Sequence, residues 1–260
     1  MKDMTKNSEK PARATRETRR TSQINLISTE IDELVKKEQK QDVVKISLPI
    51  DKLDMDKVDP RVREAIHEKY IAERIGNDIY LKYDGMHKQR IHVKLIVSAT
   101  MHNQDWTALM NTICVVGRDE FRPDVGIWIH RPTFGQQAEP IVNKCPPPDV
   151  WIEASHVFYN NQDRENALSK IAFIQQCVSG IEYVGIAIRK TINPFRRNPN
   201  SEITSTPATP QNLRPNRAPY LIHWEADNTM TYYEIDWNKH IVLNCGWKLE
   251  FNLILDVIST

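Results

Sequence analysis

The segments Pro123-Asp124-Val125-Gly126-Ile127-Trp128-Ile129 and Pro148-Asp149-Val150-Trp151-Ile152-Glu153-Ala154 decide which fold this chain is expected to adopt. Short apolar runs bounded by turn residues such as proline are typical of buried strands. Asp124 lies in the first run and Glu153 in the second. A carboxylate in a core strand is costly unless it has a partner. Two neighbouring strands of this kind predict either a metal ion between the acids or a buried hydrogen-bond network.

The order of the segments around these runs resembles that of a known family. A helix carrying Asp163 and Lys170 follows Glu153, and Gly180-Ile181-Glu182-Tyr183 then leads into the apolar strand 184–188. In this order the chain from Arg122 to Ile188 is similar to the restriction-endonuclease-like branch of the PD-(D/E)xK nuclease superfamily. The resemblance implies an α/β fold, with a mixed central sheet flanked by helices. It also implies that Asp124 and Glu153 hold Mg²⁺ or Mn²⁺ at the sheet edge.

The third residue of the superfamily motif departs from the usual pattern. The superfamily lysine lies two residues after the second acid, where the pleat of a strand puts both side chains on one face. Ser155 stands in that place here, and Lys170 is the lysine of the helix expected from about Asp163 to Val178. On a helical wheel Lys170 falls at the flank of the apolar stripe. It therefore either reaches the acids, as the resemblance implies for a catalytic lysine, or faces solvent.

An acid further upstream is a candidate third metal ligand. Pro60 and the spacing of Val62, Ile66 and Tyr70 predict a helix that begins at Asp59 and is ended by Gly76. On that helix Glu73 would project from the apolar face. An acid from the first helix joins the metal site in many members of the superfamily, so the resemblance makes Glu73 a ligand. The alternative is a surface glutamate whose stem packs on the apolar face.

Histidines and arginines near these segments are further candidate site residues. A long helix, or a helix and a turn, is expected from His87 to Leu109, and the spacing of its histidines lacks the HExxH order of a zinc helix. His87, His92 and His102 are therefore interpreted as structural or surface residues, as is His156 after the second acid. Arg118 and Arg122 flank the turn into the first acid strand, where they could hold a phosphate.

Composition limits the class of protein. The chain has 260 residues, of which 40% are hydrophobic and 27% charged, which suits one globular domain with disordered additions. With a net charge of +1, the chain as a whole has no long-range electrostatic field that would attract nucleic acid. Four widely spaced cysteines argue against a disulfide scaffold or a structural zinc site. No apolar run is long enough to span a membrane and the start is polar, so we expect an intracellular protein, cytoplasmic or nuclear.

The two ends of the chain differ from its middle. Residues 1–42 are expected to form a disordered basic tail with a short helix from Ser28, and residues 43–260 the restriction-endonuclease-like domain. Six prolines among Ser, Thr and Asn predict a disordered loop over 193–219. Segments 220–224, 231–235, 241–243 and 247–255 are expected to be strands that extend the sheet or form a second small one.

The function implied by the resemblance is Mg²⁺-dependent hydrolysis of phosphodiesters in nucleic acid, as by an endodeoxyribonuclease. Asp124, Glu153 and Lys170 would be the catalytic residues, DNA the expected partner, and a homodimer a compatible assembly. A rival hypothesis is a nuclease-like fold that acts as a nucleic-acid or protein interaction module. Ser155 in the lysine place and the near-zero net charge favour that rival. A third alternative keeps both acids as structural residues of an unrelated α/β domain.

Overall fold

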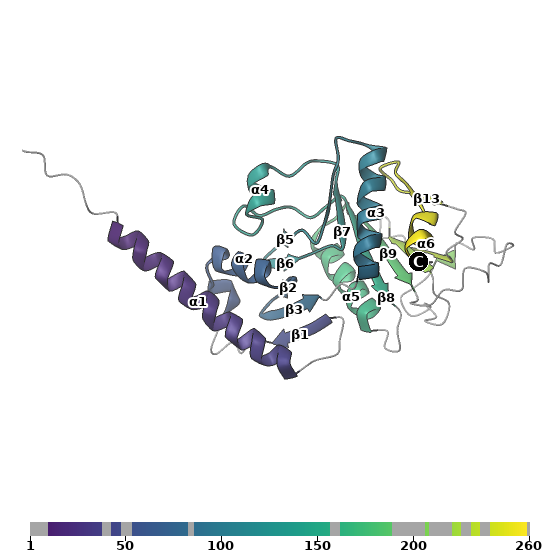
Figure 1. The fold of residues 1–260 in the computed structure, drawn as a ribbon. Coiled ribbons are helices and arrows are strands. Elements are labelled where there is room, and N and C mark those ends of the chain that lie inside the picture. The colour runs from purple at the N-terminus through teal and green to yellow at the C-terminus, as the bar shows by residue number, and fades with distance from the viewer. Residues whose placement is uncertain are drawn as a thin grey trace, which may run out of the picture. The chain divides into compact units, whose positions relative to one another are not determined.

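The computed structural model describes residues 10–37, 43–47, 54–82, 86–156, 162–188, 206–207, 220–224, 230–234 and 240–258. The chain divides into two compact units, unit 1 (Met1–Lys82) and unit 2 (Tyr83–Thr260) (Figure 1). The elements of unit 1 are α1 (Lys10–Lys37), β1 (Val43–Ser47), the short 3-10 helix η1 (Met55–Lys57), α2 (Pro60–Lys69), β2 (Ala72–Ile75) and β3 (Asp78–Lys82). Those of unit 2 are α3 (Met86–His102), β4 (Thr107–Met110), β5 (Cys114–Val116), β6 (Asp119–Phe121), β7 (Val125–Trp128), α4 (Phe134–Ala138), β8 (Val150–His156), α5 (Gln162–Cys177), β9 (Glu182–Ile188), β10 (Thr206–Pro207), β11 (Tyr220–Trp224), β12 (Met230–Glu234), β13 (His240–Val242), β14 (Lys248–Glu250) and α6 (Asn252–Ile258).

Unit 1 packs two helices and an antiparallel β1-β3-β2 arrangement around its own core. The core is formed by Ile27, Ile31, Ile46, Met55, Val58, Val62, Ile66, Ala72, Ile79 and Leu81. Helix α1 begins at Lys10, whereas the sequence predicted a helix only from Ser28. Alanine and arginine, which are common in its first half, are favourable helix formers, and the tertiary contacts of Ile27 and Ile31 stabilise the rest.

The helix predicted to carry Glu73 ends earlier than expected. Helix α2 ends at Lys69, and Tyr70 already has the extended backbone of a cap. Glu73 lies instead on strand β2, opposite Tyr80 of β3. Gly76 (φ +60°) and Asn77 form a two-residue loop between paired Ile75 and Asp78, and a glycine at positive φ favours such a hairpin. The helical placement of Glu73 was therefore wrong, and the Gly-Asn signal within the sequence would have corrected it.

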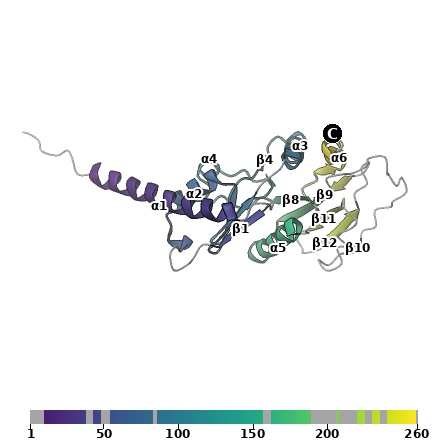
Figure 2. The ribbon, with the colours of Figure 1, turned by 60° about the horizontal axis from the view of Figure 1, so that its bottom comes forward.

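Unit 2 is built on a mixed sheet in the order β10-β12-β11-β9-β8-β7-β4. Strands β8 and β9 are parallel and joined by α5, while the other pairs are antiparallel. Figure 2 shows α3 and α6 on one face of this sheet and α5 on the other. This is the mixed sheet flanked by helices that was expected. Strands β7 and β8 are both interior strands of this sheet; Glu153 lies on β8, and Asp124 directly precedes β7.

Three segments of unit 2 differ from the predicted elements. Helix α3 ends at His102 in an Asx turn of Asn103 with the N–H of Asp105, which is the helix-and-turn alternative, but residues 107–110 pair with β7 as a strand that was not predicted. The segment 247–255 divides into strand β14 and helix α6. The connection between the acid strands contains α4, which has a capping box formed by Thr133 and Gln136. Strands β10, β11 and β12 extend the sheet, and β13 pairs with β14 separately.

Several predictions concern segments that the structure describes only in part. The Pro-rich segment 193–219 lies outside the described residues apart from β10, and so do residues 1–9. All four cysteines are free, in keeping with the absence of a disulfide scaffold in the sequence pattern. Within the described part of the chain, no helix has both the length and the apolar character that crossing a membrane requires.

Gly126 on β7 is a position where any side chain would be overpacked. A Cβ atom built there would lie 2.7 Å from the ring of Trp128 and 3.1 Å from Pro123. Because Trp128 is buried and its indole N–H donates to the carbonyl of Pro146, the ring cannot move away cheaply. Gly126→Ala is therefore expected to lower the free energy of unfolding by about 1–3 kcal/mol. Gly135→Ala, whose Cβ would meet only ordinary contacts at 3.7 Å, is the control in denaturant unfolding; an equal effect would contradict the packing argument.

Candidate active site

The two predicted acids lie on or directly beside the paired strands β7 and β8. Val125 pairs with Ile152 and Gly126 with Trp151, and Asp124 directly precedes β7. Asp124 accepts a hydrogen bond from the backbone N–H of Ala154, the residue after Glu153 on β8. Both side chains are buried, Asp124 with 1% and Glu153 with 4% of its surface exposed. Both acids are therefore buried within unit 2.

Asp124 is held by its neighbours on β8 and α3. Its Oδ2 accepts a hydrogen bond of 2.7 Å from the backbone N–H of Ala154, and Nε2 of His92 lies 3.8 Å from the same oxygen. His92 is fully buried on α3. This histidine, interpreted from the sequence as structural or surface, is thus next to the first acid. No spacing in the sequence indicates it, because its place depends on how α3 packs on the sheet.

Glu153 forms a buried ion pair with Lys170. The ammonium of Lys170 contacts Oε1 of Glu153 and also donates a hydrogen bond of 3.2 Å to the carbonyl oxygen of Arg122. The indole N–H of Trp151 donates to the same Oε1 at 2.8 Å. Lys170 keeps only 6% of its side chain exposed, so the helix α5 presents it to the sheet and not to solvent. Of the two possibilities that the helical wheel left open, the structure has the one in which the lysine reaches an acid.

The remaining residues that the sequence singled out have other positions or lie outside the described part of the chain. Glu73 is buried on β2 of unit 1, whereas the other acids lie in unit 2, and its role as a ligand stays a prediction. The guanidinium of Arg122 donates a hydrogen bond to the carbonyl oxygen of Asn111, and this contact stabilises the turn before β7. His102 packs on the ring of Trp106 at 5.1 Å. The side chains of Ser155 and His156 on β8 lie outside the described part, as does that of His87.

The donor set of Asp124 and Glu153 matches the preference of Mg²⁺ and Mn²⁺ for carboxylate oxygens. Among the residues that the structure describes, no group of three or more His, Cys, Asp or Glu side chains is arranged to hold a metal ion. Magnesium sites often use only one or two carboxylates, with water and substrate phosphate completing the shell. The acid pair therefore fits such an ion through its chemistry, and the ion itself stays a prediction.

Comparisons with known proteins give a similarity of structure but none of sequence. No protein-family model matches the chain, and no curated protein matches it in sequence. The fold is similar to the crystal structure of "a putative nuclease belonging to DUF820" from Anabaena variabilis, with a TM-score of 0.47 and 12% sequence identity. The similarity covers 72% of this chain and 90% of the other. At this level the similarity is one of fold alone.

Proposed function

We propose that the protein is a metal-dependent nuclease that hydrolyses phosphodiester bonds of nucleic acid, with DNA as its expected substrate. The observation that carries the proposal is the buried ion pair of Glu153 on β8 with Lys170 on the following helix, together with the hydrogen bond that Asp124, at the start of the paired strand β7, accepts from the backbone N–H of Ala154, the residue after Glu153. These are the residue types that the resemblance to the PD-(D/E)xK superfamily implies for its site. The lysine comes from helix α5 instead of position 155, as the resemblance implies for Lys170.

Each residue of the proposed site has a separate task. Asp124 and Glu153 would hold Mg²⁺ or Mn²⁺, which when bound supplies Lewis-acid chemistry and lowers the pKa of a water molecule. The backbone N–H of Ala154 fixes the orientation of Asp124, and the indole of Trp151 that of Glu153. The Lys170 ammonium provides a fixed positive charge beside Glu153, where it would stabilise negative charge that develops on the scissile phosphate.

A cleavage assay on mixed single- and double-stranded DNA and RNA, with Mg²⁺ or Mn²⁺ against EDTA, tests this proposal. Asp124→Asn is expected to lower the metal-dependent rate by about 10²-fold or more, because it removes a charged ligand without changing the shape. Glu182→Gln is the matched control, since Glu182 is equally buried and on the neighbouring strand β9, yet accepts from the N–H of Asn244. Equal rates for wild type and Asp124→Asn would contradict the assigned site.

A second candidate function is an interaction module without turnover. It is favoured by the engagement of each acid with donors of the protein itself, Ala154 for Asp124 and Trp151 and Lys170 for Glu153. Such contacts are also those of a buried hydrogen-bond network that only stabilises the fold. A wild-type protein that binds nucleic acid but cleaves none of the substrates with either metal would support this second candidate over hydrolysis.

A further inference from the structure

The most exposed large apolar side chain of the described residues lies between the two acid strands. Phe134, the first residue of α4, has 87% of its surface exposed. It belongs to residues 129–149, here called the connecting segment, which leaves β7 and returns to β8. Figure 1 shows α4 at the tip of this segment, set apart from the strands that it joins. Single exposed apolar residues are common on protein surfaces, and what sets this ring apart is the rigid, basic segment that presents it.

Hydrogen bonds within the connecting segment hold its tip in one conformation. The side-chain amide of Gln137 donates to the carbonyl oxygen of Pro132 at 2.7 Å. The side-chain amide of Asn143 donates to the carbonyl oxygen of Gly135 at 2.9 Å, and the capping box described above closes the first turn of α4. These bonds lie on both sides of Phe134 in the chain, so the ring is kept in its exposed position before any partner binds. A preorganised contact of this kind loses little entropy on binding.

The exposed charge of the connecting segment is positive. Its exposed charged side chains are Arg131 and Lys144, whereas its two acids, Glu139 and Asp149, are half-buried. A carboxylate oxygen of Asp149 accepts from a backbone N–H at 2.7 Å and so closes the base of the segment. Arg131 lies three residues before the ring, and the carbonyl oxygen of Lys144 accepts from the side chain of Gln136 on α4 at 3.5 Å. Both cations therefore belong to the part of the segment that carries the ring.

An exposed aromatic ring beside two cations matches single-stranded nucleic acid. Each base presents a π-face on which an aromatic side chain stacks, and this stacking depends little on sequence. Cations beside the ring then hold phosphates of the same strand. In a duplex the bases are stacked on one another, so the ring finds a partner only where a base is unpaired.

Lipid and protein partners fit the connecting segment less well. Segments that lie on membranes bury a continuous apolar face among the acyl chains. In this segment Ile129, with 36% of its surface exposed, is the one other large apolar side chain that is exposed. Protein interfaces surround an aromatic anchor with contacts that exclude water. The neighbours of Phe134 in the chain are instead the exposed Thr133 and Gly135.

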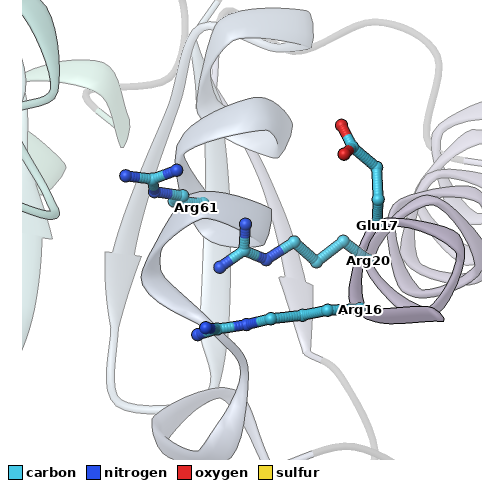
Figure 3. Close-up of a pocket in the computed structure, with 4 residues that line it drawn as sticks. All are labelled: Arg16, Glu17, Arg20 and Arg61. Carbon is cyan, nitrogen blue, oxygen red and sulfur yellow. The ribbon is translucent and has the colours of Figure 1, made fainter. Parts of the chain in front are cut away.

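Basic residues of unit 1 also lie close together, but an acid holds two of them. Arg16, Glu17, Arg20 and Arg61 line a pocket of about 450 Å³. Figure 3 shows Arg16 and Arg20 side by side and the guanidinium of Arg61 pointing away from them. Arg20 donates to Asp59 at 2.8 and 3.0 Å, and Arg16 lies 3.7 Å from the same carboxylate. Because Asp59 is the N-cap of α2, these contacts tie α1 to the start of α2.

We infer that Phe134 stacks on an unpaired base of nucleic acid while Arg131 and Lys144 hold phosphates beside it, so that the substrate is single-stranded or locally unpaired. This inference rests on the proposed function and names the form of its substrate. Strand β7 separates Asp124 from the start of the connecting segment, a length of about 17 Å at the rise of an extended strand. The stacked base therefore lies several nucleotides from the scissile bond and contributes to affinity, not to the chemical step.

Binding in EDTA, where metal-dependent hydrolysis does not operate, tests the stacking contact on the full chain. Fluorescence anisotropy measures affinity for a labelled single strand, an abasic strand of the same length and a duplex. Phe134→Ala is expected to weaken binding of the single strand by about 5- to 150-fold and to leave binding of the other two unchanged. Phe134→Leu should lose as much, because it keeps apolar surface without a π-face, and Phe134→Trp should retain the affinity. Met101→Ala, at an 80% exposed side chain of α3, is the control and should bind as wild type.

The two cations are tested through the salt dependence of the same binding. Arg131→Ala/Lys144→Ala is expected to lower the steepness of log K against log salt by about 1.4 for the single strand. Arg19→Ala/Lys36→Ala removes the same charge from exposed positions of α1 and should change the slope much less. Equal changes in the two double variants would mean that binding follows total charge and not the connecting segment. Circular dichroism checks that the variants remain folded.

The other outcomes separate this contact from the proposed function. Wild-type protein that binds no single strand, or Phe134→Leu that binds it as tightly as wild type, would overturn the inference. A dimer in light scattering that Phe134→Ala converts to a monomer, with unchanged affinity for the single strand, would assign the ring to a second copy of the chain. Binding that depends on Phe134 without any cleavage would overturn hydrolysis alone. Metal-dependent cleavage with wild-type binding in Phe134→Ala would overturn the stacking contact alone.

Discussion

Lys170→Met is expected to lower the free energy of unfolding of unit 2 by about 3–5 kcal/mol, because it leaves the carboxylate of Glu153 buried without its cation. Both side chains are at least nine-tenths buried, so water cannot replace the ammonium. Tryptophan fluorescence during denaturant unfolding measures the effect in unit 2 alone. All six tryptophans lie in that unit, namely Trp106, Trp128, Trp151, Trp224, Trp237 and Trp247.

The double variant Glu153→Gln/Lys170→Met separates the structural effect of the pair from its proposed catalytic effect. Removing both charges takes away the uncompensated carboxylate, so much of the lost stability is expected to return. Cleavage, by contrast, is expected to stay at least about 10²-fold below wild type in the single and the double variant. Lys248→Met, on an exposed lysine of β14, is the control and should change stability by less than about 0.5 kcal/mol. A stable double variant that cleaves at the wild-type rate would contradict the catalytic role.

The elements around the acid pair could be predicted because their signals are local. The apolar runs that contain Asp124 and Glu153 form β7 and β8, and the run after Gly180 forms β9. Their order along the chain was enough to expect neighbouring strands. The failure at Glu73 also has a local cause, since the turn signal of Gly76 and Asn77 was interpreted as the end of a helix.

The contacts of the site could be predicted only in part, because they depend on tertiary packing. A helical wheel places Lys170 at the flank of a stripe, and the rotation of α5 on the sheet decides whether it meets Glu153. The same holds for His92, because its position beside Asp124 depends on how α3 packs against the sheet. Helix α1 is the opposite case. Its polar first half lacks an apolar stripe, so its helical state could not be inferred from periodicity.

Trp151→Ala is expected to lower the free energy of unfolding of unit 2 by about 3–5 kcal/mol, and Trp151→Phe by about 1.5–3 kcal/mol. Alanine leaves a cavity beside Phe121, which packs edge-on against the indole at 6.4 Å. Phenylalanine keeps most of the volume but removes the N–H that donates to Glu153. The loss of stability in Trp151→Phe, measured by denaturant unfolding, therefore gives the contribution of the hydrogen bond. The additional loss in Trp151→Ala gives the contribution of packing.

Trp247→Phe is the matched control for the hydrogen bond of Trp151. Trp247 is equally buried in unit 2, and its indole N–H donates at 3.2 Å to the hydroxyl oxygen of Ser98, a neutral acceptor. Because a bond to a neutral group contributes about 0.5–1.5 kcal/mol, Trp247→Phe should cost less than Trp151→Phe. If Trp151 orients Glu153, Trp151→Phe should also slow cleavage while Trp247→Phe leaves it unchanged. Equal losses of stability with wild-type cleavage in both variants would mean that the indole of Trp151 only fills the core and has no part in positioning the acid.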